Sequence, residues 1–160
     1  MSTLYIRDGE AYREAAGQEV LDRAQAVIAQ RFRAGAPCLE NPARTAEYLK
    51  LKLGALEYEV FGFLALDARN RLIEYVELFR GTIDGAAVYP REVAREALAR
   101  NAASLILFHC HPSGNPSPSA ADEALTRRVV AGLALLDIRV LDHFIVGDGV
   151  CMSFAERGLI

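Results

Sequence analysis

The sequence predicts an α/β or α+β domain built on a mixed β-sheet. Helical and strand patterns follow one another in the order helix, helix, strand pair, helix, strand, helix, strand pair, which is typical of helices that cover a sheet. The run SLILF at residues 104–108 has the character of a strand covered on both faces. With 160 residues, 52% of them hydrophobic, the chain can bury a core of its own.

The first 37 residues are predicted to form an N-terminal amphipathic helix. Between residues 10 and 33, apolar side chains recur at helical spacing with charges between them. Arg-Ala-Gly-Ala-Pro then ends at Pro37, and this stretch breaks regular structure. We therefore predict a helical segment in residues 1–37 and the main domain in residues 38–160. The apolar positions of the helix are Val20, Leu21, Ala24, Val27, Ile28 and Phe32.

The main domain is predicted to begin with a helix and a strand pair. Asn41-Pro42 is a helix start, because Asn caps helices and Pro is favoured in the first turn. Residues 60–66 and 71–79 have strand length and flank a turn, so they should pair as a hairpin. Residues 81–89 are predicted to be loop or a short edge strand.

Two more helices surround the SLILF strand in the prediction, and a strand pair closes the domain. Pro90 opens the first of these helices. Three of the six prolines lie in residues 112–118, which must therefore be loop. A helix is predicted over residues 119–136. Residues 138–154 are predicted to form two strands joined at a Gly-Asp-Gly turn.

Composition argues against several classes of protein. The net charge is −3 and no run of like charge is long, unlike a nucleic-acid coat or a membrane-surface tail. The start MSTLYIRDGE lacks the apolar segment of a signal peptide, and no apolar run approaches the ~20 residues of a membrane span. Cys38, Cys110 and Cys151 form no CxxC pair and no disulfide framework. We therefore expect a soluble protein of a reducing compartment, the cytoplasm.

His109, His111 and Asp122 have the spacing of a metal site. Residues two apart on a strand share a face, so both histidines should point one way and Cys110 the other. The proline-rich loop then returns the chain, so that the next helix can present Asp122 to the same place. Two imidazoles and a carboxylate leave a fourth tetrahedral position open, as in catalytic zinc sites.

These residues also have simpler interpretations. Ser119-Ala-Ala-Asp122 fits a capping box, and an isolated His-x-His is often a pair of satisfied polar residues. His143 could lie beside the metal, compete as a ligand, or be a core-edge residue with a backbone partner, and Asp142 is equally open. The conjunction of strand, His-x-His, rigid loop, Ser and Asp favours the metal site.

The pattern His109-x-His111-x(7)-Ser119-x(2)-Asp122 resembles the JAMM motif of MPN (JAB1-like) zinc metallopeptidases. More closely, the segments GTIDGAAVYPREV, NAASLILFHCHPSGNPSPSAADEALT and LDHFIVGDGVCMSFAERG resemble the bacterial RadC family, long labelled DNA repair proteins. The resemblance covers about residues 40–160. It implies an MPN/JAB1-like mixed sheet flanked by helices, with cytidine-deaminase-like layering.

The resemblance also implies an activity and a set of site residues. The family's ligands for Zn²⁺ correspond to His109, His111 and Asp122. Its serine, which donates a hydrogen bond to the oxyanion, corresponds to Ser119. The family's catalytic glutamate precedes the first strand in a pattern like E-x-x-G-x-L, which Glu59 matches, whereas Glu57 has the wrong offset. The implied reaction is cleavage of an amide bond in a peptide or isopeptide by a zinc-activated water. Without the resemblance, Glu59 would be interpreted as a solvated charge at a helix end.

The sequence departs from these families at two points. Cys110 stands where RadC-like sequences usually carry Asn and JAMM peptidases often Ser or Thr; alternation turns it away from the metal, as a small buried residue. Longer RadC-like proteins have an N-terminal helix-hairpin-helix that contacts DNA, whereas residues 10–33 indicate only the amphipathic helix. Its apolar face could pack on the domain or on a second copy.

The alternative function is that of a DNA-repair accessory protein with a structural or vestigial metal site. The family's label motivates this alternative, and the acidic balance and the absence of a helix-hairpin-helix pattern weigh against it. A two-metal phosphoesterase would need more Asp and His than this cluster offers.

Overall fold

The computed structural model describes residues 4–9, 11–33, 41–81 and 88–160. The predicted boundary at Pro37 lies outside these residues, as does most of the segment 81–89 that was predicted to be loop or edge strand. Among the described helices, none combines the length and apolar character that crossing a membrane requires.

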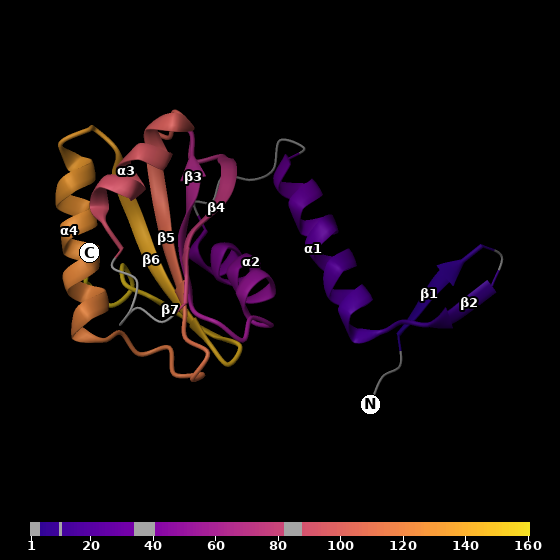
Figure 1. Cartoon of the computed structure of the whole chain (residues 1–160). Helices are drawn as coiled ribbons and strands as arrows, with labels where there is room; N and C mark the ends of the chain where they lie inside the picture. Colours follow the sequence, from indigo (N-terminus) through magenta and orange to yellow (C-terminus); the bar gives the residue numbers. More distant parts are fainter. Residues whose placement is uncertain (1–3, 10, 34–40, 82–87) are drawn as a thin grey trace.

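The N-terminal segment begins with a β-hairpin, so the prediction of one helix over residues 10–33 is wrong in its first part. Strand β1 (Tyr5–Asp8) pairs antiparallel with β2 (Ala11–Glu14), and helix α1 follows at Gly17–Arg33. Asp8-Gly9 favours a tight turn, and Gly9 adopts φ +63°. In Figure 1 the hairpin and α1 extend away from the main domain. Gln25 Nε2 of α1 donates to Leu51 O at 3.1 Å.

The main domain is built on a five-stranded mixed sheet, which confirms the predicted fold class. The strand order is β4-β3-β5-β6-β7 (Figure 1). Strand β5 pairs antiparallel with β3 and parallel with β6, and the two outer pairs are antiparallel hairpins. The bounds are β3 Val60–Leu66, β4 Leu72–Arg80, β5 Ser104–Cys110, β6 Arg139–Gly147 and β7 Val150–Ser153.

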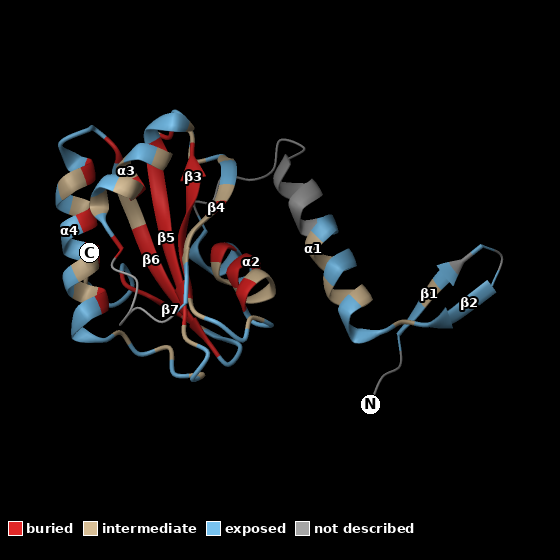
Figure 2. Cartoon of the chain, in the orientation of Figure 1, coloured by how far each residue is buried: buried red, intermediate tan, exposed pale blue. Residues whose placement is uncertain are grey.

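Helices cover both faces of this sheet. Helix α2 (Pro42–Leu53) packs on one face, where Leu49 and Leu53 meet Leu64 and Phe108. Helices α3 (Pro90–Ala99) and α4 (Ala120–Ala134) pack on the other face. Figure 2 shows the central strands buried between these layers, and every residue of β3 and β5 is buried. Strand β5 is therefore central, as its apolar run predicted.

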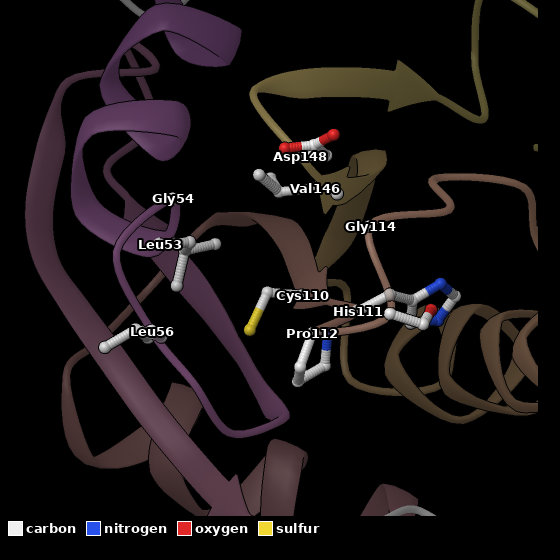
Figure 3. A pocket seen from close by; sticks show the side chains of 11 residues that line it. Leu53, Gly54, Leu56, Cys110, His111, Pro112, Gly114, Val146 and Asp148 are labelled. Atoms are coloured by element: carbon white, nitrogen blue, oxygen red, sulfur yellow. The ribbon is translucent and has the colours of Figure 1, made fainter.

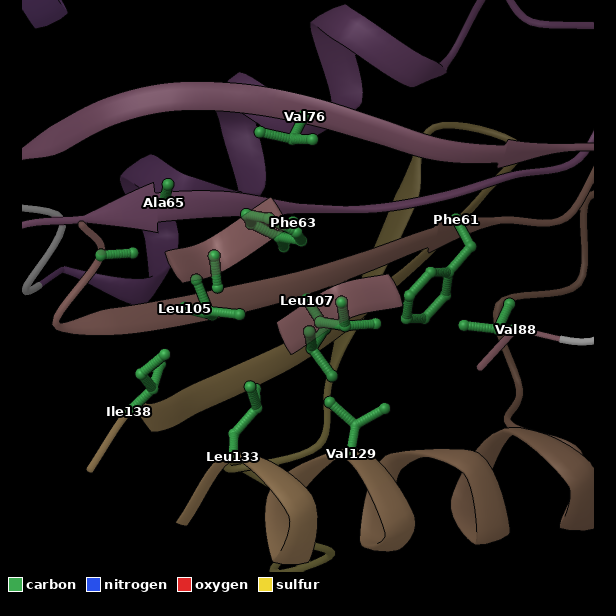
Figure 4. Packing of buried hydrophobic residues seen from close by; sticks show 13 residues of the cluster. Phe61, Phe63, Ala65, Val76, Val88, Leu105, Leu107, Val129, Leu133 and Ile138 are labelled. Atoms are coloured by element: carbon green, nitrogen blue, oxygen red, sulfur yellow. The ribbon is translucent and has the colours of Figure 1, made fainter. Parts of the chain in front are cut away.

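The core beneath α3 and α4 sets the environment of the site. Leu107 and Phe61 of the sheet pack against the inner faces of the two helices (Figure 4). Val129 and Leu133 of α4 point toward the sheet. Because successive residues of a strand alternate in direction, His109 faces this layer, whereas Cys110 belongs to the cluster beneath α2.

Candidate metal centre

Three polar side chains meet where β5 ends and α4 begins. His109 is the penultimate residue of β5, His111 follows the strand, and Asp122 lies in the first turn of α4. The connection from β5 through α4 to the parallel strand β6 is a crossover, which returns the helix over the strand that it leaves. The loop at residues 112–118 thus brings Asp122 back to the histidines.

The distances suit a small divalent ion. His109 Nδ1 lies 3.2 Å from Asp122 Oδ1, and His111 Nε2 lies 3.7 Å from Asp122 Oδ2. The three residues offer ligand atoms that lie within 4.8 Å of one another. Tetrahedral zinc, with bonds of about 2.0–2.2 Å to nitrogen and oxygen, separates its ligand atoms by roughly 3.3–3.6 Å. The group therefore fits such an ion with little movement.

His109 is the most unusual member of the group. Its side chain is 1% exposed, and neither ring nitrogen has a hydrogen-bond partner within the described residues. Its 3.2 Å approach to Asp122 therefore lacks the alignment of a hydrogen bond. Unpaired buried polar atoms cost free energy, and coordination of a cation by Nδ1 would satisfy one of them.

The tautomer of His111 is set by the loop. Its Nδ1 lies 2.7 Å from the carbonyl oxygen of Asn115, and because a carbonyl only accepts, Nδ1 carries the proton. In the neutral tautomer with this bond, the lone pair lies on Nε2, which faces Asp122. A backbone carbonyl that orients a histidine in this way is typical of metal-binding imidazoles.

Asp122 is held as a carboxylate. Its Oδ2 accepts from the backbone N–H of Ser119 at 2.7 Å and from the Ser119 hydroxyl at 2.6 Å. Burial alone would raise the pKa of Asp122, but nearby His109 and the bonds from Ser119 outweigh burial and hold the pKa below its usual range. A carboxylate beside two imidazoles is a suitable donor set for a divalent cation.

Ser119 combines the two interpretations that the sequence allowed. It is the N-cap of α4: its Oγ accepts from Asp122 N at 3.1 Å, completing a capping box. The same side chain is exposed and hydrogen-bonded to the candidate ligand. The capping box is therefore also the device that orients Asp122.

Glu59 lies at the same end of the sheet as the histidines. It directly precedes β3, whose first residues Val60 and Phe61 stand opposite Cys110 and His109. Its side chain is half-buried, and its carbonyl accepts from Gly81 N at 3.0 Å. Glu57 is exposed. Glu59 is not part of the ligand group.

The packing around Gly62, the glycine of the E-x-x-G pattern, leaves no room for a side chain. A Cβ on Gly62 would overlap the carbonyl oxygen of Val76 and lie 2.5 Å from the ring of Phe108. Only glycine lets β4 and the Phe108 ring approach β3 so closely at this point. This close packing holds the strand that follows Glu59.

His143 lies on the same sheet face as His109 but outside the ligand group. It stands opposite Leu107 in the parallel pair β5–β6 and is completely buried. Its Nδ1 lies 2.7 Å from Thr126 Oγ1, so its partner is a side chain and not the backbone. Burial is the main reason that its pKa falls to about 3, so His143 is neutral. The sequence patterns did not single out Thr126; its i+4 spacing from Asp122 was the only available signal.

Asp142 lies at the open end of the β6–β7 hairpin and outside the ligand group. Its Oδ1 accepts from the backbone N–H groups of His143 at 2.7 Å and Ala155 at 3.0 Å, and its Oδ2 accepts from the Ser153 hydroxyl at 2.6 Å. These three hydrogen bonds tie β6 to the end of β7 and to the segment that follows it.

Cys110 lies on the far side of β5 from the candidate ligands, as alternation predicts. Its Sγ donates to Tyr58 O at 3.3 Å, and burial raises the pKa of the thiol. In Figure 3 Cys110 points toward Leu53 and Leu56, whereas the His111 ring points the other way. These residues line a pocket of about 240 Å³.

Comparison with known proteins identifies the family. The model of the RadC-like JAB domain matches residues 39–159. A UPF0758 protein of Vibrio cholerae is 53% identical over 140 residues, covering 88% of each chain. UPF0758 proteins of Azotobacter vinelandii and Nitrosococcus oceani are 54% and 59% identical over 141 and 122 residues, covering 88% and 76% of this chain. The matches span only 62% and 54% of these two relatives, so the chain is shorter than either. The chain belongs to the RadC-like JAB domain family.

Proposed function

We propose that this domain is a metal-dependent hydrolase of the JAMM type, a zinc metallopeptidase or isopeptidase. The observation that carries the proposal is the buried pair His109 and Asp122, at 3.2 Å, with both ring nitrogens of His109 lacking a hydrogen-bond partner among the described residues. The family match supports the same chemistry.

The ion would be held by His109 Nδ1, His111 Nε2 and a carboxylate oxygen of Asp122. Two nitrogen donors and one oxygen donor suit zinc, with a position left for water or substrate. When bound, such an ion supplies Lewis acidity and lowers the pKa of a coordinated water to about 7.

Glu59 is the candidate general acid and base. In this role it accepts a proton from the attacking water and delivers it to the leaving amine. Its position directly before β3, whose first residues lie opposite the end of β5, is compatible with this role.

Ser119 is the candidate donor to the developing oxyanion of the substrate. Its hydroxyl now bonds Asp122 Oδ2 and would have to turn toward the substrate carbonyl. The loss of such a donor raises the barrier by ~3 kcal/mol. Because Ser119 is exposed, this side of the site is open to a substrate such as a peptide or isopeptide segment.

Metal analysis tests the ligand assignment. We expect about one zinc per chain in the purified wild type, and loss of that zinc in His109→Ala and in Asp122→Ala. Ser113→Ala, an exposed substitution in the same loop, is the matched control. Zinc that persists in both ligand variants would exclude this site.

A substrate trap tests the activity. In cells that carry Glu59→Gln, we expect a peptide or conjugate to accumulate that wild-type cells process. The Glu57→Gln variant, altered at an exposed glutamate two residues earlier, should not accumulate it. Salt-dependent DNA binding of the wild type, without any accumulating peptide, would support the DNA-associated alternative instead.

A further inference from the structure

We propose that His143 is a positioning residue of the metal centre, which acts through Thr126 on Asp122. The proposal rests on the function proposed above, because it concerns the geometry of the same ligand set. It begins from a completely buried, neutral histidine to which the proposed reaction assigns no role.

A chain of short hydrogen bonds joins His143 to the candidate ligand. His143 Nδ1 lies 2.7 Å from Thr126 Oγ1, and Thr126 Oγ1 donates to the carbonyl oxygen of Asp122 at 2.6 Å. Thr126 is itself buried. Strand β6 is therefore tied by hydrogen bonds to the first turn of α4, at the residue whose carboxylate faces His109.

The hydrogen bonds from His143 through Thr126 to Asp122 determine the tautomer of His143. The Thr126 hydroxyl has one hydrogen, and the Asp122 carbonyl can only accept it. The remaining contact therefore requires that His143 Nδ1 donates to Thr126 Oγ1. Consequently the Nε2 atom of His143 carries an unprotonated lone pair.

The lone pair on Nε2 of His143 could accept a hydrogen bond, and the ring nitrogens of His109 lack a hydrogen-bond partner among the described residues. The buried side-chain atoms without a hydrogen-bond partner, among the residues described, are both ring nitrogens of His109 and Nε2 of His143. If Nδ1 of His109 binds the ion, its Nε2 carries a proton and needs an acceptor. His143 presents an acceptor on the same face of the sheet. In these tautomers, Nε2 of His109 is a donor and Nε2 of His143 is an acceptor.

Packing leaves His143 little freedom to reorient. Its ring centroid lies 4.5 Å from that of Phe154 and 5.8 Å from that of Phe61, which crosses it edge-on. The backbone N–H of Phe154 bonds the carbonyl of His143 at 2.9 Å, and Asp142 accepts its N–H. A ring held in this way can transmit a fixed position to Thr126.

Two substitutions of His143 and one of Thr126 test whether His143 positions Asp122 or only fills space in the core. His143→Asn keeps an N–H donor near the position of Nδ1, whereas His143→Leu removes the donor. Thr126→Val removes the hydroxyl at nearly constant shape. The measurements are zinc affinity by competition with a chelator, and the melting temperature of the metal-free protein.

We expect His143→Leu and Thr126→Val each to weaken zinc binding about 10- to 100-fold, as loss of an orienting partner does. His143→Asn keeps the donor to Thr126 but lacks the Nε2 acceptor, so its zinc affinity should lie between those of His143→Leu and the wild type. The double variant His143→Leu/Thr126→Val should bind zinc no more weakly than the weaker single variant, because both act in one chain. Zinc affinity unchanged in folded His143→Leu or Thr126→Val would overturn the proposal, even if the melting temperature falls.

A measurement that needs neither metal nor activity tests the tautomer. In ¹⁵N NMR spectra of the metal-free protein near neutral pH, Nδ1 of His143 should be protonated and Nε2 should not. A protonated Nε2 would overturn the hydrogen-bond chain. If the wild type binds no zinc, the proposed function fails, yet the NMR result still decides the arrangement of His143.

Discussion

His109 Nδ1 on β5 lies 3.2 Å from Asp122 Oδ1 on α4, and both side chains are almost fully buried. The carboxylate keeps its position through the capping box, in which Ser119 donates twice to Oδ2 and leaves Oδ1 toward His109. The start of helix α4 and the candidate ligand are therefore one structural unit.

Ser119→Ala should lower both stability and metal affinity. The substitution removes the N-cap of α4, a loss of about 1 kcal/mol in unfolding free energy, and frees Asp122 Oδ2 from its 2.6 Å bond. Zinc affinity should fall about tenfold. Urea denaturation and chelator competition measure the two effects. Ser113→Ala should change neither quantity. A Ser119→Ala protein with wild-type zinc affinity would show that the bond from Ser119 is not needed to orient Asp122.

Gly62→Ala should be severely destabilising. The new Cβ would overlap the Val76 carbonyl oxygen, and backbone in a central sheet cannot move aside cheaply. We expect a loss of at least about 3 kcal/mol, at the upper end for overpacking, measured by urea denaturation. In Gly132→Ala of α4, the Cβ meets only Pro90 at 3.7 Å, so this control should be neutral or stabilise the helix by up to about 1 kcal/mol. Equal stability of the two variants would contradict the packing of β3.

Protonation of His143 should destabilise the metal-free protein in acid. Burial lowers the pKa of His143 to about 3 from its ordinary 6.5, so between these values the unfolded chain binds a proton that the folded chain does not. The unfolding free energy should therefore decrease as the pH falls from about 6.5 toward 3. His143→Leu should show a shallower decrease over this range in urea denaturation at several pH values. Parallel curves for the two proteins would mean that His143 is not held neutral.

Cys110→Ala should leave metal binding intact. Cys110 faces the α2 side of the sheet and donates to Tyr58 O, so its loss should reduce the unfolding free energy by about 1 kcal/mol. Zinc affinity should stay within about twofold of wild type, in contrast to His109→Ala on the opposite face of the same strand. Loss of zinc from folded Cys110→Ala would mean that the thiol reaches the ion.

Local patterns predicted most of the main domain. Alternation along residues 109–111 is enough to separate Cys110 from the two histidines, because side-chain direction on a strand has a period of two. Asn41-Pro42 and Ser119 marked helix starts that the structure confirms. The sequence prediction missed the N-terminal hairpin because it continued the helical pattern of α1 back over Ala11–Glu14, which form a strand. The Asp8-Gly9 pair before this strand favours a turn.

The sequence by itself determined the fold class, the central position of β5 and the set His109, His111 and Asp122, because each depends on local periodicity, spacing and family resemblance. Only the tertiary structure decided that both ring nitrogens of His109 lack partners among the described residues and that His143 bonds Thr126. Those facts depend on how the crossover lays α4 over β5 and β6. Distances across such a crossover arise from the packing of whole layers, which no local pattern encodes.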